Sequence, residues 1–504
     1  MSSWLDALQA ILGATALVWY VVLWTVCLIG YSVAKELFEC SWPRSPLSSA
    51  NPATTDVPGV SILRPLAGLD CNLFTNLCST FEQQYPTDRF EIILSVRSEY
   101  DQALNIARQV KERYPHISST IIVGDVEASV NPKINNLVRS YAAAVFDIIW
   151  VVDSQVWLSP QALSRAVDAL TLRPVSPVPQ WMHRKPNGDR VGLVHHVPLG
   201  VLPADTLASH VERVFLSTTH AKMYLAINAV AIDSCVMGKS NMYRKSDLER
   251  VPDSFFQYKH DIPGIGSRAF DDESTRTGAV TDNAPIEQSL DVVHGNARAL
   301  ARYGIYLAED NMLAMSLWRP PLKLAHRISP GDVAQVAVGD IQTLGEYAKR
   351  RMRWIRVRRH MVPLATYLEP FTESLVAGGL AWYGLRMYVL RGWILGSSIQ
   401  TWIAFALFFL LHLTAWYWVD MSVLVALRHG EPLPDAEQRY LFMAWCVREC
   451  LAFPIWLWAM LGHTVTWRGQ RYRILRDSRA APASTESTGS TEALSLSLIH
   501  ISEP

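Results

Sequence analysis

Long apolar stretches lie at both ends of the chain. The first extends from Ala7 to Ala34 without a charged residue, and a transmembrane helix needs about 20 apolar residues. No basic segment precedes it, and it is longer than the apolar part of a signal peptide, so it predicts an uncleaved anchor within residues 1–36. Three further stretches predict membrane helices within residues 361–466: Ser374 to Leu390, Trp393 to Val419 and Tyr440 to Gly462.

Basic residues flank the C-terminal apolar block on both sides. Seven Lys and Arg lie between Lys349 and Arg359, and five Arg lie between Arg468 and Arg479. Cytoplasmic segments next to membrane spans collect Lys and Arg, so both flanks are expected on the cytosolic side. This requires an even number of crossings, although three stretches are present. Either one stretch is interfacial or re-entrant, or one stretch crosses twice, and we expect Ser374 to Leu390 to lie in the membrane interface.

Between these ends, residues 57–360 alternate short apolar runs with amphipathic ones. The helix pattern covers Asp101 to Tyr114 and Lys133 to Phe146. Such alternation predicts an α/β domain with a mostly parallel sheet and helices on both faces, whose ligands bind beyond the carboxyl ends of the strands. The predicted strands are Val60 to Leu66, Phe90 to Val96, Thr120 to Val123, Ile148 to Val152, Val191 to Val197 and Ala226 to Ile232.

Two stretches interrupt the alternation. Residues 174–190 are rich in proline, and residues 251–300 are polar and weakly periodic, so both are predicted to be surface insertions. The Ser/Thr-rich tail at residues 480–504 is predicted to be disordered.

Composition narrows the class of protein. Half of the residues are hydrophobic and only 18% are charged, which favours a membrane protein. Lys and Arg balance Asp and Glu at 46 each, so no overall field attracts nucleic acid. The seven Cys form no CxxC pair, which argues against a disulfide scaffold or a structural zinc site and suits a reducing compartment.

Three residues stand where a parallel sheet places its chemistry. Asp153 ends an apolar run and is either a ligand of a divalent cation that holds a sugar nucleotide, or a turn residue. Asp310 is either a general base or a helix cap. Lys133 begins a predicted helix, where it either meets a phosphate or belongs to a capping segment.

The most distinctive cluster is Arg350-Arg-Met-Arg-Trp354. Arg350 and Arg353 share a helix face beside Trp354, so they could clamp phosphates. The alternative is a basic helix held on anionic lipid, and both could hold together. His220 could donate a hydrogen bond to a substrate, although a lone His is more often structural.

Taken in order, five motifs between the N-terminal anchor and the C-terminal membrane block resemble those of ceramide glucosyltransferases, in a fungal-like form with insertions. The resemblance extends from about Trp4 to Arg476. The motifs are Val60 to Gly68, Asn131 to Leu137, Ile149 to Ser154, Ala308 to Asp310 and Arg350 to Trp354.

This resemblance implies a GT-A nucleotide-sugar transferase. Such an enzyme moves glucose from UDP-glucose to the primary hydroxyl of ceramide with inversion, and the product is β-glucosylceramide. The family implies a multi-pass protein of the Golgi or ER membrane with its catalytic domain in the cytosol, and Mg²⁺ or Mn²⁺ as the cofactor. UDP-glucose, ceramide and the lipid bilayer are the expected partners, and the oligomeric state stays open.

The resemblance also assigns roles to residues. Asp153 is expected to engage UDP-glucose and the metal, and Asp310 is expected to be the base. Arg350, Arg353 and Trp354 match the element near the pyrophosphate and the acceptor. Near the acceptor, the resemblance adds two further residues: His220 and Cys235.

The sequence departs from the family pattern after the predicted strand Phe90 to Val96. Ser98 stands where the first family Asp is expected, so either Glu99 or Asp101 contacts the uridine or the uridine is held in another way. The second motif reads Asp-Ser-Gln instead of Asp-x-Asp, so metal ligation would rest on Asp153 alone.

Two other classes of function share some of these sequence features. A processive β-glycosyltransferase of the cellulose, chitin or hyaluronan synthase type shares strand-end Asp residues and a Q-x-x-R-W element, but here Arg350 replaces the Gln and the predicted spans are too few to line a polymer channel. A non-catalytic membrane lipid-binding paralogue is supported only by the missing first Asp.

Overall fold

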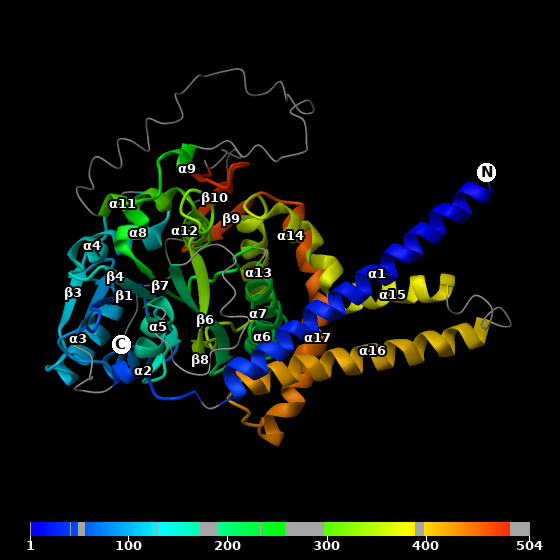
Figure 1. Ribbon diagram of the computed structural model, residues 1–504, viewed down its shortest axis with the longest axis horizontal. Helices are drawn as coiled ribbons and strands as arrows, with labels where there is room; N and C mark the ends of the chain where they lie inside the picture. The colour runs from blue at the N-terminus through cyan, green and yellow to red at the C-terminus, as the bar shows by residue number, and fades with distance from the viewer. Residues whose placement is uncertain are drawn as a thin grey trace, which may run out of the picture.

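The computed structural model describes residues 2–40, 42–48, 56–127, 129–171, 190–231, 233–257, 297–388 and 398–483. An α/β domain forms one end of the molecule, and an arm of long helices projects from it (Figure 1).

The α/β domain is built on an eight-stranded sheet in the order β3-β2-β1-β4-β7-β6-β8-β5. The first four strands in this order are parallel, β7 is antiparallel to both of its neighbours, and β6 and β8 are parallel. The fold-class prediction of a mostly parallel GT-A sheet is therefore confirmed. The strands are β1 (Val60–Leu66), β2 (Phe90–Val96), β3 (Ser119–Val123), β4 (Ile148–Val152), β5 (Val156–Trp157), β6 (Val191–Val201), β7 (Ser240–Arg244) and β8 (Ala325–Ala337).

Helices cover both faces of the sheet because its strands are apolar on both sides. In β1, Ile62 joins one buried cluster with the helices α2, α3 and α5, and its neighbour Leu63 joins a second cluster with α4, α11 and α12. The helices of this domain are α2 (Leu73–Phe81), α3 (Ala103–Arg113), α4 (Pro132–Ala143), α5 (Ala162–Thr171), α6 (Leu207–Phe215), α7 (Ala221–Val230), α8 (Lys245–Glu249), α9 (Ser254–Gln257), α11 (Arg298–Ala301) and α12 (Glu309–Trp318).

The predicted strand Ala226 to Ile232 is wrong over its described part. These residues continue α7, which ends at Ala231 in a left-handed conformation (φ 56°). Helix α7 packs so closely on α1 (Ser2–Ala34) that a Cβ on Gly30 would lie 2.2 Å from the backbone oxygen of Lys222. Tertiary packing thus overrides the local preference of this apolar run.

The predicted insertions lie mostly outside the described residues. Where the second one ends, the prediction is wrong, because Ala297, Ala299 and Leu300 are buried against α4 and α8. Their apolar side chains make them part of the core.

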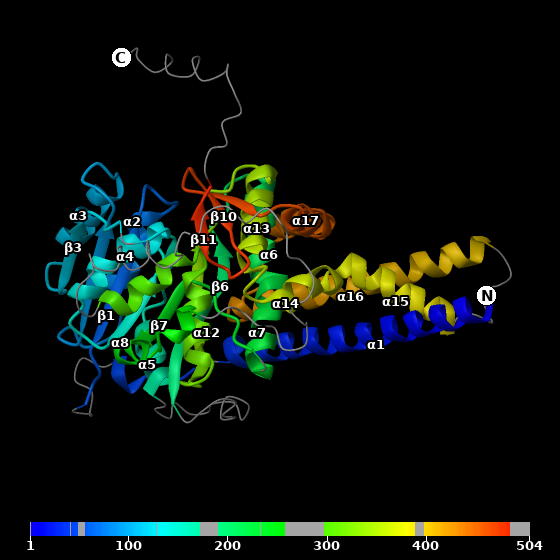
Figure 2. The ribbon, with the colours of Figure 1, turned by 90° about the horizontal axis from the view of Figure 1, so that it is seen from above.

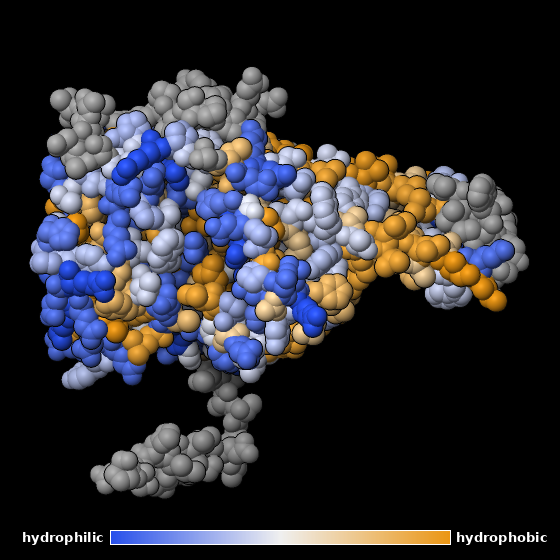
Figure 3. Space-filling view, turned by 90° about the horizontal axis from the view of Figure 1, so that it is seen from below, coloured by the Kyte–Doolittle hydropathy of each residue, from blue (hydrophilic) through white to orange (hydrophobic). Residues whose placement is uncertain are grey.

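The arm consists of α1, α15 (Ser374–Tyr388) and α16 (Ser398–Leu427), which lie side by side in both views (Figures 1 and 2). Glycines allow α1 and α15 to approach, since a Cβ on Gly384 would lie 2.7 Å from the backbone oxygen of Gly13. Apolar side chains cover much of the arm surface in Figure 3. The segment Ser374 to Leu390 was expected to lie in the membrane interface, away from the membrane-spanning helices. Its described residues instead pack within this bundle as α15.

The last long helix, α17 (Asp435–Met460), takes a different path. It packs on α6 and on α13 (Leu344–Arg358), beside the α/β domain. By length and composition, three described helices could cross a membrane, and α17 is one of them together with Trp4–Glu39 and Ile399–Leu427.

A small antiparallel sheet follows α17. It consists of β9 (Thr464–Trp467), β10 (Gln470–Ile474) and β11 (Ala480–Pro482). The prediction of a disordered tail from residue 480 is therefore wrong for the residues of β11, whose Ala480 is buried. Residues 484–504 lie outside the described part of the chain. A short helix, α14 (Pro363–Leu368), links α13 to the arm.

Candidate active site

Charged side chains from distant motifs meet at the carboxyl end of β4. Asp153 follows this strand, and its Oδ1 lies 2.9 Å from the Nζ of Lys133, in the first turn of α4. The same Nζ lies 3.1 Å from Oε1 of Glu309, the first residue of α12. The structure thus brings together two predicted site residues, Asp153 and Lys133, with an acidic residue that was not predicted.

Asn131 fixes the positions of Lys133 and Glu309. As the N-cap of α4, its Oδ1 accepts hydrogen bonds from the backbone N–H groups of Lys133 and Ile134. Its Nδ2 donates to Oε2 of Glu309 at 2.8 Å and to the backbone oxygen of Tyr306. The predicted capping segment is confirmed, and it also joins the starts of α4 and α12.

A second lysine completes the surroundings of Asp153. The Nζ of Lys239 lies 2.8 Å from Oδ2 of Asp153, and the backbone N–H of Asp153 donates to the Lys239 oxygen. Burial alone would raise the pKa of Asp153, but the charges of Lys133 and Lys239 outweigh it and hold that pKa well below its usual range. Both carboxylate oxygens of Asp153 are thus bound to ammonium groups.

Asp310 lies next to this cluster at the start of α12. It stands against the backbone of Gly238, where an added Cβ would lie 2.8 Å from its Oδ2. Burial and the neighbouring charge of Glu309 raise the pKa of Asp310 to about 6, despite the opposing charge of Lys133. A carboxyl with this pKa is well placed to accept a proton near neutral pH.

The Arg-rich motif lies on α13, which begins with a capping box between Thr343 and Glu346. The Nε of Arg350 lies 2.9 Å from Oε1 of the buried Glu212, and its guanidinium lies 5.1 Å from the ring centre of Trp354. The expected clamp of two free guanidinium groups is therefore altered, because Glu212 neutralises Arg350.

Arg353 pairs with no carboxylate among the described residues. Burial, and then the charge of Arg350, lower its pKa to about 10. Its guanidinium lies 5.9 Å from the ring centre of Trp467, in β9. Arg353 is thus the member of this motif whose charge is available to an anion.

His220 and Cys235 border the same region. His220 ends a π-helical turn, with its ring 5.5 Å from Phe215 and 5.6 Å from Tyr224. Burial, and then the charge of Arg351, lower its pKa to about 3, so this ring is neutral at neutral pH. Burial raises the pKa of Cys235 to about 11, and its thiol is therefore protonated.

The residues after β2 serve the loop rather than the charged cluster. Oδ1 of Asp101 accepts hydrogen bonds from the backbone N–H groups of Gly68 and Ala103, each at 2.9 Å, so it joins the loop after β1 to the start of α3. Glu99 is exposed to solvent. Neither side chain contacts Asp153 or Asp310 in the structure.

The predicted metal site can be tested against these contacts. Within the described ranges, no three His, Cys, Asp or Glu side chains are grouped to hold a metal ion. The residue after Asp153 is Ser154, whose hydroxyl donates to Asp70. A divalent cation at Asp153 would meet the ammonium groups of Lys133 and Lys239, so the donor set fits such an ion poorly.

Lys239, Glu212 and Glu309 were missed by sequence reasoning. Glu309 could have been noticed, because it directly precedes the predicted Asp310. Both carboxylates therefore lie at the start of the same helix, where negative charge is favoured. Lys239 follows a Gly just before β7, which pairs with β4. That pairing, and with it the contact to Asp153, is a long-range feature without a local signal.

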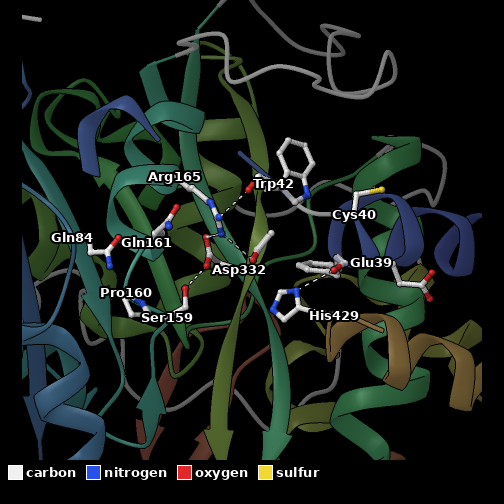
Figure 4. Close-up of a pocket in the computed structure, with 12 residues that line it drawn as sticks. Glu39, Cys40, Trp42, Gln84, Ser159, Pro160, Gln161, Arg165, Asp332 and His429 are labelled. Atoms are coloured by element: carbon white, nitrogen blue, oxygen red, sulfur yellow. Dashed lines mark hydrogen bonds and ion pairs between the residues drawn. The ribbon is translucent and has the colours of Figure 1, made fainter. Parts of the chain in front are cut away.

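A separate cavity of about 460 Å³ lies where the π-helical turn Lys35–Glu39, which follows α1, meets α5 and β8 (Figure 4). In its wall, Arg165 and Asp332 form an ion pair of 3.1 Å, and the ring Nδ1 of His429 lies 3.0 Å from the backbone oxygen of Phe38. None of the charged residues described above lines it, so it is distinct from the candidate site.

Acidic and basic groups at the carboxyl edge of a mostly parallel sheet lie where α/β enzymes bind their ligands, and comparison with family models identifies the class as a glycosyltransferase. The model of glycosyl transferase family 21 matches residues 22–252 and 294–480, which is more than half of the chain. The chain therefore belongs to glycosyl transferase family 21.

Known relatives agree with this assignment. A ceramide glucosyltransferase of Komagataella phaffii is 33% identical, over 93% of this chain and 91% of the relative. One of Candida albicans is 28% identical, over 84% and 87%, and ceramide glucosyltransferase 1 of Caenorhabditis elegans is 26% identical, over 88% and 77%. Among solved structures, a mannosyltransferase of Pyrobaculum calidifontis with GDP-Man and Mn²⁺ matches 83% of this chain and 98% of its own at 15% identity, with a TM-score of 0.40.

Proposed function

We propose that the protein transfers glucose from UDP-glucose to the primary hydroxyl of ceramide with inversion, giving β-glucosylceramide. The observation that carries this proposal is the convergence of Lys133, Asp153 and Asp310 on one point at the carboxyl end of β4. These residues come from separate motifs of the resemblance, and the relatives that cover most of the chain are ceramide glucosyltransferases.

Asp310 acts as the general base. Its carboxylate takes the proton of the ceramide hydroxyl while that oxygen forms a bond to the anomeric carbon. The bond between this carbon and the β-phosphate oxygen breaks, and UDP leaves with the electron pair. Attack from the side opposite to the leaving group inverts the anomeric centre. Burial and Glu309 hold the pKa of Asp310 at about 6, which suits this proton transfer.

Arg353 stabilises the charge of the departing UDP. It is the cation of the Arg-rich motif without a carboxylate partner among the described residues, and fixed positive charge stabilises a developing anion. Arg350, held by Glu212, orients the indole of Trp354 beside it. The resemblance implies Mg²⁺ or Mn²⁺ at Asp153, but the two ammonium groups there fit a cation poorly, so no step is assigned to a metal.

The acceptor lies on the aromatic side of the site. Phe215 packs 6.2 Å from Trp354 and 5.5 Å from His220 between ring centres, which gives a rigid apolar wall for the lipid. His220 and Cys235, both uncharged, line the approach of the ceramide hydroxyl. On the donor side, Glu99 and Asp101 stay the predicted contacts of the uridine.

The arm anchors the enzyme in the bilayer. Helices α1 and α16 are long enough to cross it, and α15, whose 15 described residues pack along α1, crosses it beside them. Helix α17 does not cross, because its two ends are held by helices α6 and α13 beside the α/β domain. Near its start, Glu437 pairs with Arg213 of α6 at 2.7 Å, and at its end Arg356 donates to the backbone oxygens of Trp458 and Ala459. With 26 residues, α17 is about 39 Å long, and it lies along the membrane surface.

This arrangement gives an even number of crossings between the two basic flanks. The α/β domain, the end of α1 and the start of α17 then share the cytosolic side of a Golgi or ER membrane. An N-glycosylation acceptor inserted between Tyr388 and Ser398 should be modified in the lumen, whereas one inserted at Gly430 should not. The reverse pattern would show that α16 and α17 are the crossing pair.

The direct test of the proposed reaction is mass-spectrometric detection of hexosylceramide. The reconstituted protein is incubated with ceramide and either UDP-glucose or UDP-galactose, with Asp310→Asn as the control. Product from UDP-glucose that is lost in Asp310→Asn supports the reaction and the base. Absence of product from both donors, in protein that still binds UDP, would refute the proposed function.

A further inference from the structure

Asp153 lies between two lysines whose hydrogen-bonding states differ. Lys133 uses its three N–H donors on protein oxygens: Oδ1 of Asp153, Oε1 of Glu309 and the backbone oxygen of Gly238, at 2.9, 3.1 and 3.1 Å. An ammonium group with three partners has no donor left for a ligand. Lys133 therefore belongs to the framework of the site, and its predicted contact with phosphate loses its basis.

Lys239 is held differently. Among the described residues its Nζ contacts only Oδ2 of Asp153, at 2.8 Å, so two N–H donors remain. Only 7% of the residue is exposed. A buried ammonium group with unused donors is costly to leave unsatisfied, and a diphosphate offers the oxygens that it lacks.

We propose that Lys239 binds the diphosphate of the sugar nucleotide and supplies, together with Arg353, the positive charge that a divalent metal supplies in other enzymes of this fold. This inference rests on the proposed function and assigns a catalytic residue to it. When the anomeric bond breaks, the β-phosphate gains a negative charge, and the Nζ of Lys239 stabilises it by hydrogen bonding. Asp153 then holds Lys239 in place, and UDP binds without added metal.

The test is UDP affinity of the full chain in detergent with EDTA, measured by isothermal titration. The variants are Lys239→Met and Lys239→Arg. The matched control is Lys245→Met, because Lys245 is also 7% exposed and its Nζ donates to the Ala144 oxygen, away from the cluster. Lys239→Met should weaken UDP binding about ten- to hundredfold, the range for a lost charged hydrogen bond. Lys239→Arg should restore most of the affinity, and the control should match the wild type.

Uridine, tested as a competitor, separates a contact with phosphate from a general disturbance of the site. Its affinity should be the same in Lys239→Met as in the wild type. Equal loss for UDP and uridine would overturn the proposal, as would unchanged UDP affinity. If Lys239→Met does not fold, UDP binding by the wild type with and without Mn²⁺ is the test. Binding that appears only when Mn²⁺ is added would also overturn the proposal.

These binding measurements need no ceramide, so they are independent of the proposed reaction. Wild-type protein that binds UDP in EDTA but forms no hexosylceramide would refute the proposed function and leave the role of Lys239 in diphosphate binding intact. If the wild type forms hexosylceramide but Lys239→Met binds UDP as tightly as the wild type, the proposed function stands and the role of Lys239 is refuted.

Discussion

Replacing Asp310 with Asn removes the proposed base while keeping the shape of the side chain. An amide cannot accept the ceramide proton, and general base catalysis contributes about 10² to 10⁴ in rate. This corresponds to about 3 to 5 kcal/mol of transition-state stabilisation. We therefore expect turnover to fall by this factor, while the affinity for UDP changes little because Asp310 lies on the acceptor side.

The same substitution should stabilise the folded protein at neutral pH. The pKa of Asp310 rises from 3.8 to about 6 on folding, so the folded state holds the proton more tightly than the unfolded state. The stabilisation from this proton is complete below pH 3.8 and is lost as the pH rises through 6. The free energy of unfolding changes by about 3 kcal/mol between these limits. Asn does not ionise, so Asp310→Asn should melt above the wild type at pH 7.5, and the difference should be clearly smaller at pH 4.5.

Two assays check this reasoning. Initial rates of hexosylceramide formation, measured between pH 5 and 8, should show wild-type kcat/KM falling about tenfold per pH unit below pH 6, since the protonated carboxyl is inactive. Thermal unfolding in detergent at the two pH values tests the stability change. Turnover of Asp310→Asn close to that of the wild type, or a wild-type rate that is flat between pH 5 and 7, would refute the assignment of the base.

Further predictions concern the residues that hold the site together. Arg353→Ala should raise the donor KM about ten- to hundredfold and weaken inhibition by UDP, whereas unchanged inhibition would remove Arg353 from the diphosphate. Glu212→Gln leaves Arg350 buried without its counter-charge, so it should lower the melting temperature, and the double variant with Arg350→Gln should be less destabilised than the sum of the single changes. Asn131→Ala loses the cap of α4 and the hydrogen bond to Glu309, so denaturation should show a free energy of unfolding lower by about 1–2 kcal/mol. A variant as stable as the wild type would contradict this role.

Local patterns predicted the parts of the fold that depend on local sequence. Strands β1, β2 and β4 have the predicted bounds because each is a continuous apolar run between turn residues. Ala226 to Val230 has a similar apolar character, yet it is helical because it packs on α1. The difference comes from a partner about 200 residues away, which periodicity does not contain.

The residues of the candidate site also fall into two groups, those that the local sequence indicates and those that only tertiary packing brings into place. Asp153 and Asp310 could be found because they follow short apolar runs, and Asn131 could be recognised as a cap. Lys239 and Glu212 could not, because their roles depend on strand pairing and on the packing of α6 against α13. Sequence reasoning placed charged residues near the reaction, but the structure was needed to show which charges neutralise one another.

The basic segment between Lys349 and Arg359 shows why that distinction matters for function. Its charge suggested a helix held on anionic lipid, but Arg351 and Arg358 both pair with Glu369, and Arg356 and Arg359 donate to backbone oxygens at the end of α17 and just after it. Helix α13 therefore uses most of its charge to bind α17 and the start of the arm. Arg353 projects from the same helix without such a partner in the described structure. Helix α13, which packs on α17, thus also positions the cation proposed for UDP, so a shift of α17 would move that cation relative to Asp310.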